Sequence, residues 1–249
     1  MQILVCIDDT DNLSSPGTGK LASRIVEAIV EQGWGESHWG ITRHQLLVHP
    51  DVPYTSHNSC MCFNAEIEDK YLRSLIDFAS EFLQRESAEG SDPGLCVAIP
   101  DRITKLDSLI DFGYRAKEAV LIKEEAYNLA NKLGIHLSEH GGTGQGVIGA
   151  LAGVGLRLSG NDGRFRGKHQ IGAVNQAISV RDACAQTNID LVRSLDGIVL
   201  MDDEVIHLGE KVKTVLMDGK SILLVYPFSE GTPDGVKWQT CTKQQLKRF

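Results

Sequence analysis

The chain starts with a short apolar run that ends in three carboxylates within four residues. The run at residues 3–7 predicts a buried strand, and Asp8, Asp9 and Asp11 follow it directly. Like charges this close together repel one another unless a cation or water screens them. The end of the strand therefore predicts a metal site. The alternative interpretation is an acidic, solvated turn that caps the next helix.

A glycine-rich turn connects these carboxylates to a predicted helix over residues 18–31. The helix is indicated by Leu21, Ile25 and Ile29, which recur at four-residue spacing. Backbone N–H groups at a helix start suit phosphate, and carboxylates suit hard cations such as Mg²⁺. The turn is not a P-loop, because Ser14 and Leu21 stand where that motif needs a glycine and a hydroxyl residue. Together the carboxylates and the helix start predict a metal–nucleotide site.

The composition limits the classes of partner. The chain has 249 residues and a net charge of −8, so its overall charge does not favour nucleic acid. Arg164, Arg166 and Lys168 predict a local phosphate-binding strip, and a plain solvated loop is the equal alternative. No apolar run is long enough to span a bilayer, and the acidic start of the chain does not resemble a signal peptide. We therefore expect a cytoplasmic protein with no membrane partner.

The six cysteines lie mostly in apolar, strand-like runs. In a chain without a secretory signal, this placement predicts reduced thiols in the core. Cys60 and Cys62 would point to the same face of a strand, which favours a packing role. A zinc site that includes His57 is the less favoured alternative, because the sequence has no second close pair of cysteines.

The N-terminal part of the chain predicts the order strand, helix, strand, strand, helix, strand. The strands are expected at residues 1–7, 41–48, 58–67 and 95–99, and the helices at 18–31 and 71–85. This order is the split βαβ pattern of ferredoxin-like units. A polar, turn-rich stretch at residues 87–94 then predicts a boundary.

A second set of elements follows this boundary. A helix is expected at 116–133, a short strand at 135–138 and a helix of small residues at 147–154. From residue 196 onward, short apolar runs at 198–201, 205–208, 211–217 and 221–226 predict a small antiparallel β module. Asp218-Gly219 is a strong signal for a hairpin turn within it.

The glycines at positions 144, 146 and 149 match the spacing of a dinucleotide-binding fingerprint. A single match of this kind is weak, and no strand with a terminal acid follows at the expected distance. Close helix packing explains these glycines equally well, and contact between the preceding loop and a ligand remains a third interpretation. No Ser/His/Asp or Cys/His nucleophile arrangement can be placed from the sequence.

The residues Ile7-Asp8-Asp9-Thr10-Asp11 resemble the signature of the archaeal isoleucine-tRNA agmatinylcytidine synthetase (TiaS) family. Three further stretches are similar to that family in the same order, and the match covers roughly residues 1–160. They are the proline-containing segment Leu46–Asn58 with Pro50, Pro53 and Tyr54-Thr55, the boundary Asp92-Pro93-Gly94, and the run Gly146–Ala152.

This resemblance implies an α+β protein made of three parts. They are a kinase-like α/β domain at residues 1–92, a ferredoxin-like α+β domain at 93–195 and the small antiparallel β module at 196–249. In the family the aspartates bind Mg²⁺ and ATP, and a threonine is autophosphorylated. The resemblance therefore implies that Asp8, Asp9 and Asp11 are catalytic and hold the metal, and that Thr18 takes the place of that threonine. The implied cofactor-binding residues are Thr10, Gly17, Thr18, Gly19, Lys20, Asn58, Gly144 and Gly146.

The implied activity is that of an ATP- and Mg²⁺-dependent phosphotransferase or ligase. The family consumes ATP to activate a cytidine base for attack by agmatine. This chain departs from the family pattern at Gly17-Thr18-Gly19, where the family has Cys-Thr-Thr, and at His57, where it has glycine. We also expect neither the OB-fold nor the zinc ribbon of the family. We therefore expect a nucleotide partner, and an RNA base, small amine or metabolite as acceptor.

RNA would bind weakly or through a partner protein, and a homo-oligomer remains open. A non-catalytic nucleotide-binding module of the same fold is the alternative function. Three clustered carboxylates favour the enzyme, because a binding module rarely needs them unless it needs the metal.

Overall fold

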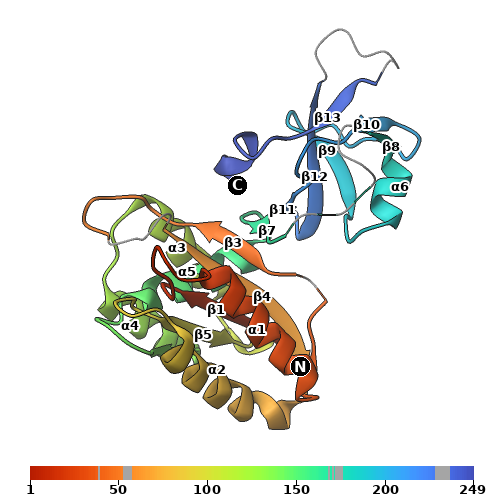
Figure 1. The fold of residues 1–249 in the computed structure, drawn as a ribbon. Helices are drawn as coiled ribbons and strands as arrows, with labels where there is room; N and C mark the ends of the chain where they lie inside the picture. Colours follow the sequence, from red (N-terminus) through yellow and green to blue (C-terminus); the bar gives the residue numbers. More distant parts are fainter. Residues whose placement is uncertain (39, 53–57, 168, 170, 172–175, 228–235) are drawn as a thin grey trace. The chain divides into compact units, whose positions relative to one another are not determined.

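The structure is a computed structural model (Figure 1). It describes the chain except for residues 39, 53–57, 168, 170, 172–175 and 228–235 and the side chains of residues 247 and 248. The chain divides into two compact units, Met1–Ser159 and Gly160–Phe249. None of the described helices combines the length and the apolar character needed to cross a membrane.

The first unit is built on an antiparallel sheet with the strand order β6-β5-β1-β4-β3. Strand β1 lies at its centre between β4 and β5, and the short strand β2 pairs with the far end of β4. The bounds are β1 Gln2–Asp8, β2 Gly35–Glu36, β3 Thr42–Gln45, β4 Ser59–Ile67, β5 Gly94–Ala98 and β6 His136–Glu139.

Helices cover both faces of this sheet, so the unit has three layers (Figure 1). Side chains alternate along β1, so that Ile3, Val5 and Ile7 pack against α1 and α2 while Leu4 and Cys6 face the other layer. The helices of the first layer are α1 Thr18–Glu31 and α2 Leu72–Glu86, and those of the second are α3 Leu106–Glu118, α4 Lys123–Leu133 and α5 Gly146–Ser159. Short 3₁₀ turns lie at Asp69–Tyr71 and Pro100–Arg102.

For residues 1–99 the predicted order of the longer strands and helices is confirmed, with small shifts at the ends, and the short strand β2 was not predicted. Helix α1 spans the predicted residues 18–31, and the two central strands β1 and β4 are flanked as in a split βαβ unit. Gly33 and Gly134 end α1 and α4 in the left-handed conformation, with φ of 66° and 68°.

Two elements differ from the prediction. The expected helix at 116–133 is interrupted where the backbone is extended at Ala119 and Ile122: its first residues end α3, which begins at Leu106 and was not predicted, and the rest forms α4. The expected strand at 41–48 is only Thr42–Gln45, because the Leu47 N–H turns away from the sheet and donates to the Ala116 carbonyl (3.1 Å).

The expected boundary between residues 92 and 93 falls inside the first unit. Strand β5 follows that boundary directly, yet it pairs with β1 from Leu4–Ala98 to Asp8–Gly94. The division into a kinase-like domain and a ferredoxin-like domain stays a prediction.

The second unit contains a mixed sheet, not the purely antiparallel module predicted from residue 196. Strands β9 and β12 pair in parallel, and so do β10 and β13. The bounds are β7 Arg164–Phe165, β8 Ala177–Ser179, α6 Val180–Ala185, β9 Leu191–Ser194, β10 Val205–His207, β11 Thr214–Met217, β12 Lys220–Pro227, β13 Trp238–Thr240 and a 3₁₀ turn Gln245–Arg248. Residues 198–201 form only a single bridge, between Val199 and Arg193. The hairpin turn at Asp218-Gly219 is confirmed, and both residues have positive φ.

The six cysteines are free, as predicted. Cys6, Cys60, Cys62 and Cys96 lie together in the core between the sheet and α5. Burial raises the pKa of the Cys6 and Cys96 thiols, so these groups stay protonated and act as packing residues.

Candidate acidic site at the end of the central strand

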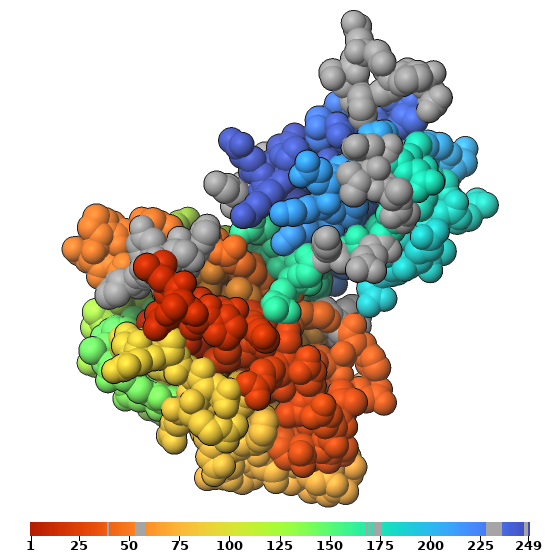
Figure 2. Space-filling model, in the orientation of Figure 1, coloured from red at the N-terminus to blue at the C-terminus, as the bar shows by residue number. Residues whose placement is uncertain are grey.

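The turn after β1 places the predicted carboxylates at one end of the sheet. Asp8 is the last residue of β1 and is 7% exposed. Asp9 takes a left-handed backbone conformation with φ of 48°, which is uncommon for a residue with a side chain. Figure 2 shows red N-terminal residues beside yellow residues. In this region Asn12 Nδ2 donates to the Glu89 carbonyl (3.3 Å).

Helix α5 packs closely against the same strand end. A Cβ at Gly146 would overlap the backbone of β5 and of Asp92, and a Cβ at Gly149 would overlap the Asp8 carboxylate. Gly144 precedes the helix with a φ of 75°. Close packing therefore accounts for Gly146 and Gly149, and a left-handed turn accounts for Gly144.

A cavity of about 470 Å³ lies in the first unit beside these residues. Such a volume is within the usual range for a small-molecule site, roughly 300–1,000 Å³. Its described polar lining includes Asp8, Asp9, Asp11, Thr18, Asp51, Asn58, Asp92, Lys123, Glu124 and Gln145. The aliphatic lining is formed by Leu46, Leu47, Val52, Ala116, Ala119, Val120, Leu121, Ile122 and Ile148, with Gly146 and Gly149 at the start of α5.

Six of the residues predicted from the sequence line this cavity: Asp8, Asp9, Asp11, Thr18, Asn58 and Gly146. The described lining does not include Thr10, Gly17, Gly19, Lys20 or Gly144. Pro53, Tyr54, Thr55 and His57, from the proline-containing segment, lie outside the described residues.

The predicted residues outside the lining have visible local roles. The Thr10 carbonyl accepts the Ala88 N–H (3.0 Å), and its hydroxyl is buried with no hydrogen-bond partner among the described residues. Gly17 caps α1 with a φ of 85°. Lys20 is exposed on the first turn of α1. Thr10 therefore supports the turn through its carbonyl, and Gly17 supports the start of the helix.

Asn58 holds the loop that forms one wall of the cavity. Its Nδ2 donates to the Leu47 carbonyl (2.7 Å). Its own carbonyl accepts the Leu46 N–H (2.9 Å) and the Gln45 side-chain amide (2.6 Å). These bonds tie the chain after β3 to the start of β4.

The carboxylates repel one another, as their spacing predicted. Burial raises the pKa of Asp8 to about 8, and the charges of Asp9 and Asp11 add to this shift. Burial also raises the pKa of Asp9 to about 6, with further contributions from Asp92 and Asp11, while a backbone hydrogen bond at Asp92 lowers it. Without a bound cation, Asp8 is therefore mostly protonated at pH 7, because its surroundings do not stabilise a further negative charge.

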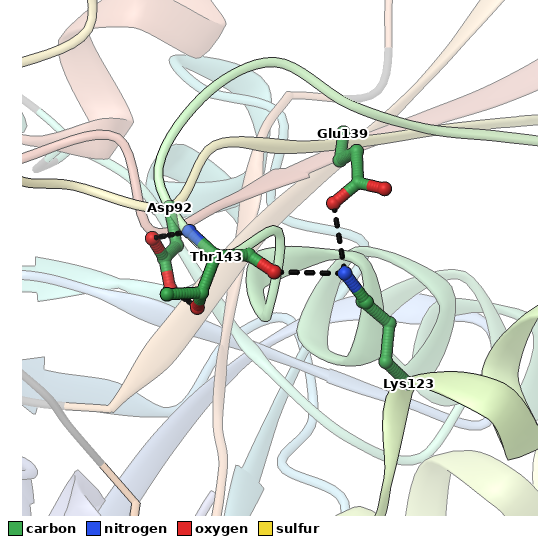
Figure 3. A network of polar contacts seen from close by, with 4 residues as sticks. All are labelled: Asp92, Lys123, Glu139 and Thr143. Atoms are coloured by element: carbon green, nitrogen blue, oxygen red, sulfur yellow. Dashed lines mark hydrogen bonds and ion pairs between the residues drawn. The ribbon is translucent and has the colours of Figure 1, made fainter.

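The sequence prediction did not assign Asp92 and Lys123 to the site. Figure 3 shows how the two are connected: Asp92 Oδ1 accepts the Thr143 N–H (2.6 Å), and Lys123 Nζ donates to the Thr143 carbonyl (2.8 Å). Lys123 Nζ also pairs with Glu139 Oε2 (3.0 Å). The sequence pattern predicts a domain boundary at Asp92 and the interior of a longer helix at Lys123.

The carboxylates of the cavity suit a hard cation that also binds the oxygens of a second ligand, such as a phosphate. Among the described residues, no group of three or more His, Cys, Asp or Glu side chains is arranged to hold a metal ion by itself. Mg²⁺ typically takes only one or two protein carboxylates and completes its shell with phosphate oxygens and water. The uncompensated carboxylates Asp8 and Asp9 fit that requirement.

The predicted basic strip is not a continuous exposed surface. Arg164 lies in β7 and is 9% exposed, and burial lowers the pKa of its guanidinium group. Arg166 is exposed, and Lys168 lies outside the described residues.

The chain is similar to several solved structures. No protein-family model and no curated protein matches it. The crystal structure of a tRNA fluorescent labeling enzyme is 30% identical, with a TM-score of 0.54 and coverage of 62% of this chain and 36% of that chain. The complex of TiaS with an isoleucine tRNA and ATP is 29% identical with a TM-score of 0.55, at the same coverage of both chains. The complex of TiaS with the same tRNA, AMPCPP and agmatine is 28% identical with a TM-score of 0.53, again covering 62% and 36%.

The fold and the cavity define an α+β protein with an acidic site at the end of its central strand. The solved structures show that the chain is similar to TiaS over 62% of its length, which confirms the resemblance carried by its motifs. The chain spans about a third of the length of the structures that it matches.

Proposed function

We propose that this chain is an ATP- and Mg²⁺-dependent enzyme of the phosphotransferase or ligase class that takes part in modifying RNA or a nucleotide. The observation that carries the proposal is the meeting of Asp8, Asp9, Asp11 and Thr18 in one cavity at the end of β1. An acidic strand end beside a helix start is the arrangement that a metal-bridged phosphate requires.

In this proposal Asp8 and Asp9 hold the Mg²⁺ together with the phosphates of ATP. The bound metal would neutralise phosphate charge and stabilise the charge that develops during transfer. Asp11 adds negative charge on the cavity wall and supports the metal side. Each carboxylate must lose its proton to bind, so burial of Asp8 makes the site sensitive to pH.

Thr18 and Lys123 would act on the phosphate side of the cavity. Thr18 is the first residue of α1 and is buried, but it lines the cavity. The first turn of α1 contains no acidic side chain, so the helix start is free to favour an anion. Lys123 supplies the positive charge, and its bonds to Glu139 and the Thr143 carbonyl hold the ammonium group in place.

The substrate class follows from the similar proteins. The TiaS structures contain ATP or AMPCPP, a tRNA for isoleucine and, in one of them, agmatine. We propose a nucleotide and a small amine or metabolite as partners of this chain, with an RNA base as the acceptor. Because the chain is acidic and Arg164 is buried, RNA would bind weakly or with the help of a partner protein.

A thermal-shift titration with ATP, with and without Mg²⁺, tests the proposal. ATP with Mg²⁺ at one hundred times its dissociation constant should stabilise the fold by about 2.7 kcal/mol. ATP without Mg²⁺ should give a much smaller shift. No shift with millimolar ATP and Mg²⁺ would rule the site out. Binding without turnover in the presence of candidate amines and RNA would instead favour the non-catalytic binding module.

A further inference from the structure

The chain between β9 and β10 in the second unit carries several exposed apolar side chains (Figure 1). Ile198 is 53% exposed, Val199 is 54% exposed and Met201 is 68% exposed. Val205, at the start of β10, is 39% exposed, whereas Leu200 is buried in the core of this unit. Single exposed apolar residues are common on protein surfaces, but four within eight consecutive positions form a local apolar surface.

Backbone hydrogen bonds hold this stretch, residues 196–205, which we call the connecting segment. The Ile198 N–H donates to Ser194 Oγ (2.9 Å), and the Ile198 carbonyl accepts the Ser194 N–H (2.8 Å). The Leu200 N–H donates to the Val192 carbonyl (3.0 Å). The connecting segment therefore lies alongside β9 and has a defined conformation.

Glu204 fixes the turn that carries Met201, the most exposed of the four apolar residues. Its Oε2 accepts the Met201 N–H (2.7 Å), and its Oε1 accepts the Trp238 Nε1–H (3.1 Å). The Glu204 N–H in turn donates to the Met201 carbonyl (3.0 Å). A surface that is already ordered loses little conformational entropy when a partner covers it.

Acidic side chains accompany this apolar surface. The connecting segment contains no lysine or arginine but four carboxylates, those of Asp196, Asp202, Asp203 and Glu204. The arginines nearby have partners of their own, because Arg181 pairs with Asp202 (3.6 Å) and Arg193 pairs with Asp218 (2.9 Å). The other two aspartates of the segment are exposed and have no ion-pair partner within the described part of the chain.

The carboxylates select among the surfaces that could cover the apolar residues. A second copy related by two-fold symmetry would bring the same aspartates face to face, where like charges repel. An anionic membrane surface or RNA would meet the same repulsion. A protein segment with apolar side chains flanked by lysine or arginine complements both the apolar surface and the charge.

We propose that the connecting segment is a docking site for a basic, amphipathic segment of another protein. The apolar side chains of the partner cover Ile198, Val199 and Met201, and its cations face Asp196 and Asp203. The apolar contact supplies affinity, and the charges around it favour basic partners and make the association sensitive to salt. The site lies within the second unit, so the proposal does not depend on the function proposed for the first unit.

Fluorescence anisotropy of the full chain with three synthetic helical peptides tests the proposal. The first peptide carries leucines on one face and lysines beside them, the second has glutamate in place of lysine, and the third has serine in place of leucine. The leucine–lysine peptide should bind at least about tenfold more tightly than either of the others, and added salt should weaken its binding. Equal binding of any two peptides, or no binding at all, would overturn the proposal.

Variants separate the apolar contact from the charge. Ile198→Ser combined with Met201→Ser should weaken binding of the leucine–lysine peptide by at least about tenfold. Asp196→Asn combined with Asp203→Asn should weaken it and reduce its dependence on salt. Val30→Ser, at a similarly exposed apolar residue of α1, is the control and should leave binding unchanged. Unchanged binding in the folded serine double variant, with its fold verified by circular dichroism, would overturn the proposal.

Two further measurements test the other occupants of this surface. Wild type and the serine double variant should sediment alike, and neither should bind vesicles of neutral phosphatidylcholine. Self-association of the wild type that the double variant abolishes would overturn the proposal and assign the surface to a second copy of the chain. Vesicle binding that the double variant abolishes would overturn it in favour of a lipid surface.

Discussion

The Asp8 carboxylate packs against Gly149 of α5 so closely that a Cβ at Gly149 would overlap it. This contact removes water from the carboxylate, which agrees with the buried position of Asp8 and its raised pKa. The closeness of helix and strand end is possible only because the helix residue has no side chain.

Gly149→Ala should therefore destabilise the fold, although alanine is the better helix former. The added methyl group must displace the Asp8 carboxylate or Leu46, and overpacking of this kind costs about 1–3 kcal/mol. Urea denaturation of the purified variant measures the change. Adding Asp8→Ala to Gly149→Ala should recover part of the loss. No recovery would mean that the overlap with the Leu46 side chain dominates.

The stability of the ligand-free protein should fall as pH rises toward 8, through the contribution of Asp8. The pKa of Asp8 is about 8 in the folded protein, against 3.8 for an unperturbed aspartate. Between these values the folded state holds a proton that the unfolded state has lost, so the free energy of unfolding decreases with pH. The contribution is complete below pH 3.8 and is lost above the folded pKa.

Denaturation of wild type and Asp8→Asn at about pH 5.5 and about pH 8.5 measures this contribution. The asparagine carries no titrating proton, so the variant should lose less stability between the two pH values. Comparing the pH-dependent change in stability of the two proteins also cancels the contribution of His136 and His140. Their lowered pKa values make stability rise with pH, opposite to the effect of Asp8. A wild type that gains stability relative to Asp8→Asn on going to the higher pH would disprove the assignment.

Asp9→Asn should abolish Mg²⁺-dependent ATP binding and leave the fold intact. The substitution keeps the shape of the side chain but removes a charge that Asp92 and Asp11 repel. The melting temperature without ligand should stay the same or rise. Thermal shifts with ATP and Mg²⁺ give the result, and Asp101→Asn, an exposed aspartate outside the described cavity lining, is the control. Unchanged ATP affinity in Asp9→Asn would contradict the metal site and favour the alternative, in which the carboxylates form a solvated turn that caps α1.

Thr18 should become phosphorylated when the protein is incubated with ATP and Mg²⁺. It stands at the start of α1 and lines the cavity, where the helix dipole favours added negative charge. Intact-mass and fragment spectra should place one phosphate on residue 18 in the wild type and in Thr18→Ser. Thr18→Val, which lacks the hydroxyl, should remain unmodified. Full turnover by a folded Thr18→Val protein would show that the phosphothreonine is not required.

The spacing of residues along the chain predicted those elements whose conformation depends mainly on their sequence neighbours. Leu21, Ile25 and Ile29 predicted α1 with its observed ends, because the spacing of buried residues and the glycine at the cap act within a few turns. The clustering of Asp8, Asp9 and Asp11 was also visible, since all three follow one strand. The extended stretch between α3 and α4 was not visible, because its apolar residues continue a pattern that suits a helix.

The sequence by itself determined the order of the main strands and helices up to residue 99, the buried thiols and the cluster of carboxylates after β1. Only the tertiary structure brought Asp92 and Lys123 to these carboxylates, because both come from segments far along the chain. It also explained the glycines of α5, whose role depends on what packs against them. Spacing along a chain controls local conformation and charge density, whereas the partners of each side chain are decided by which segments pack together.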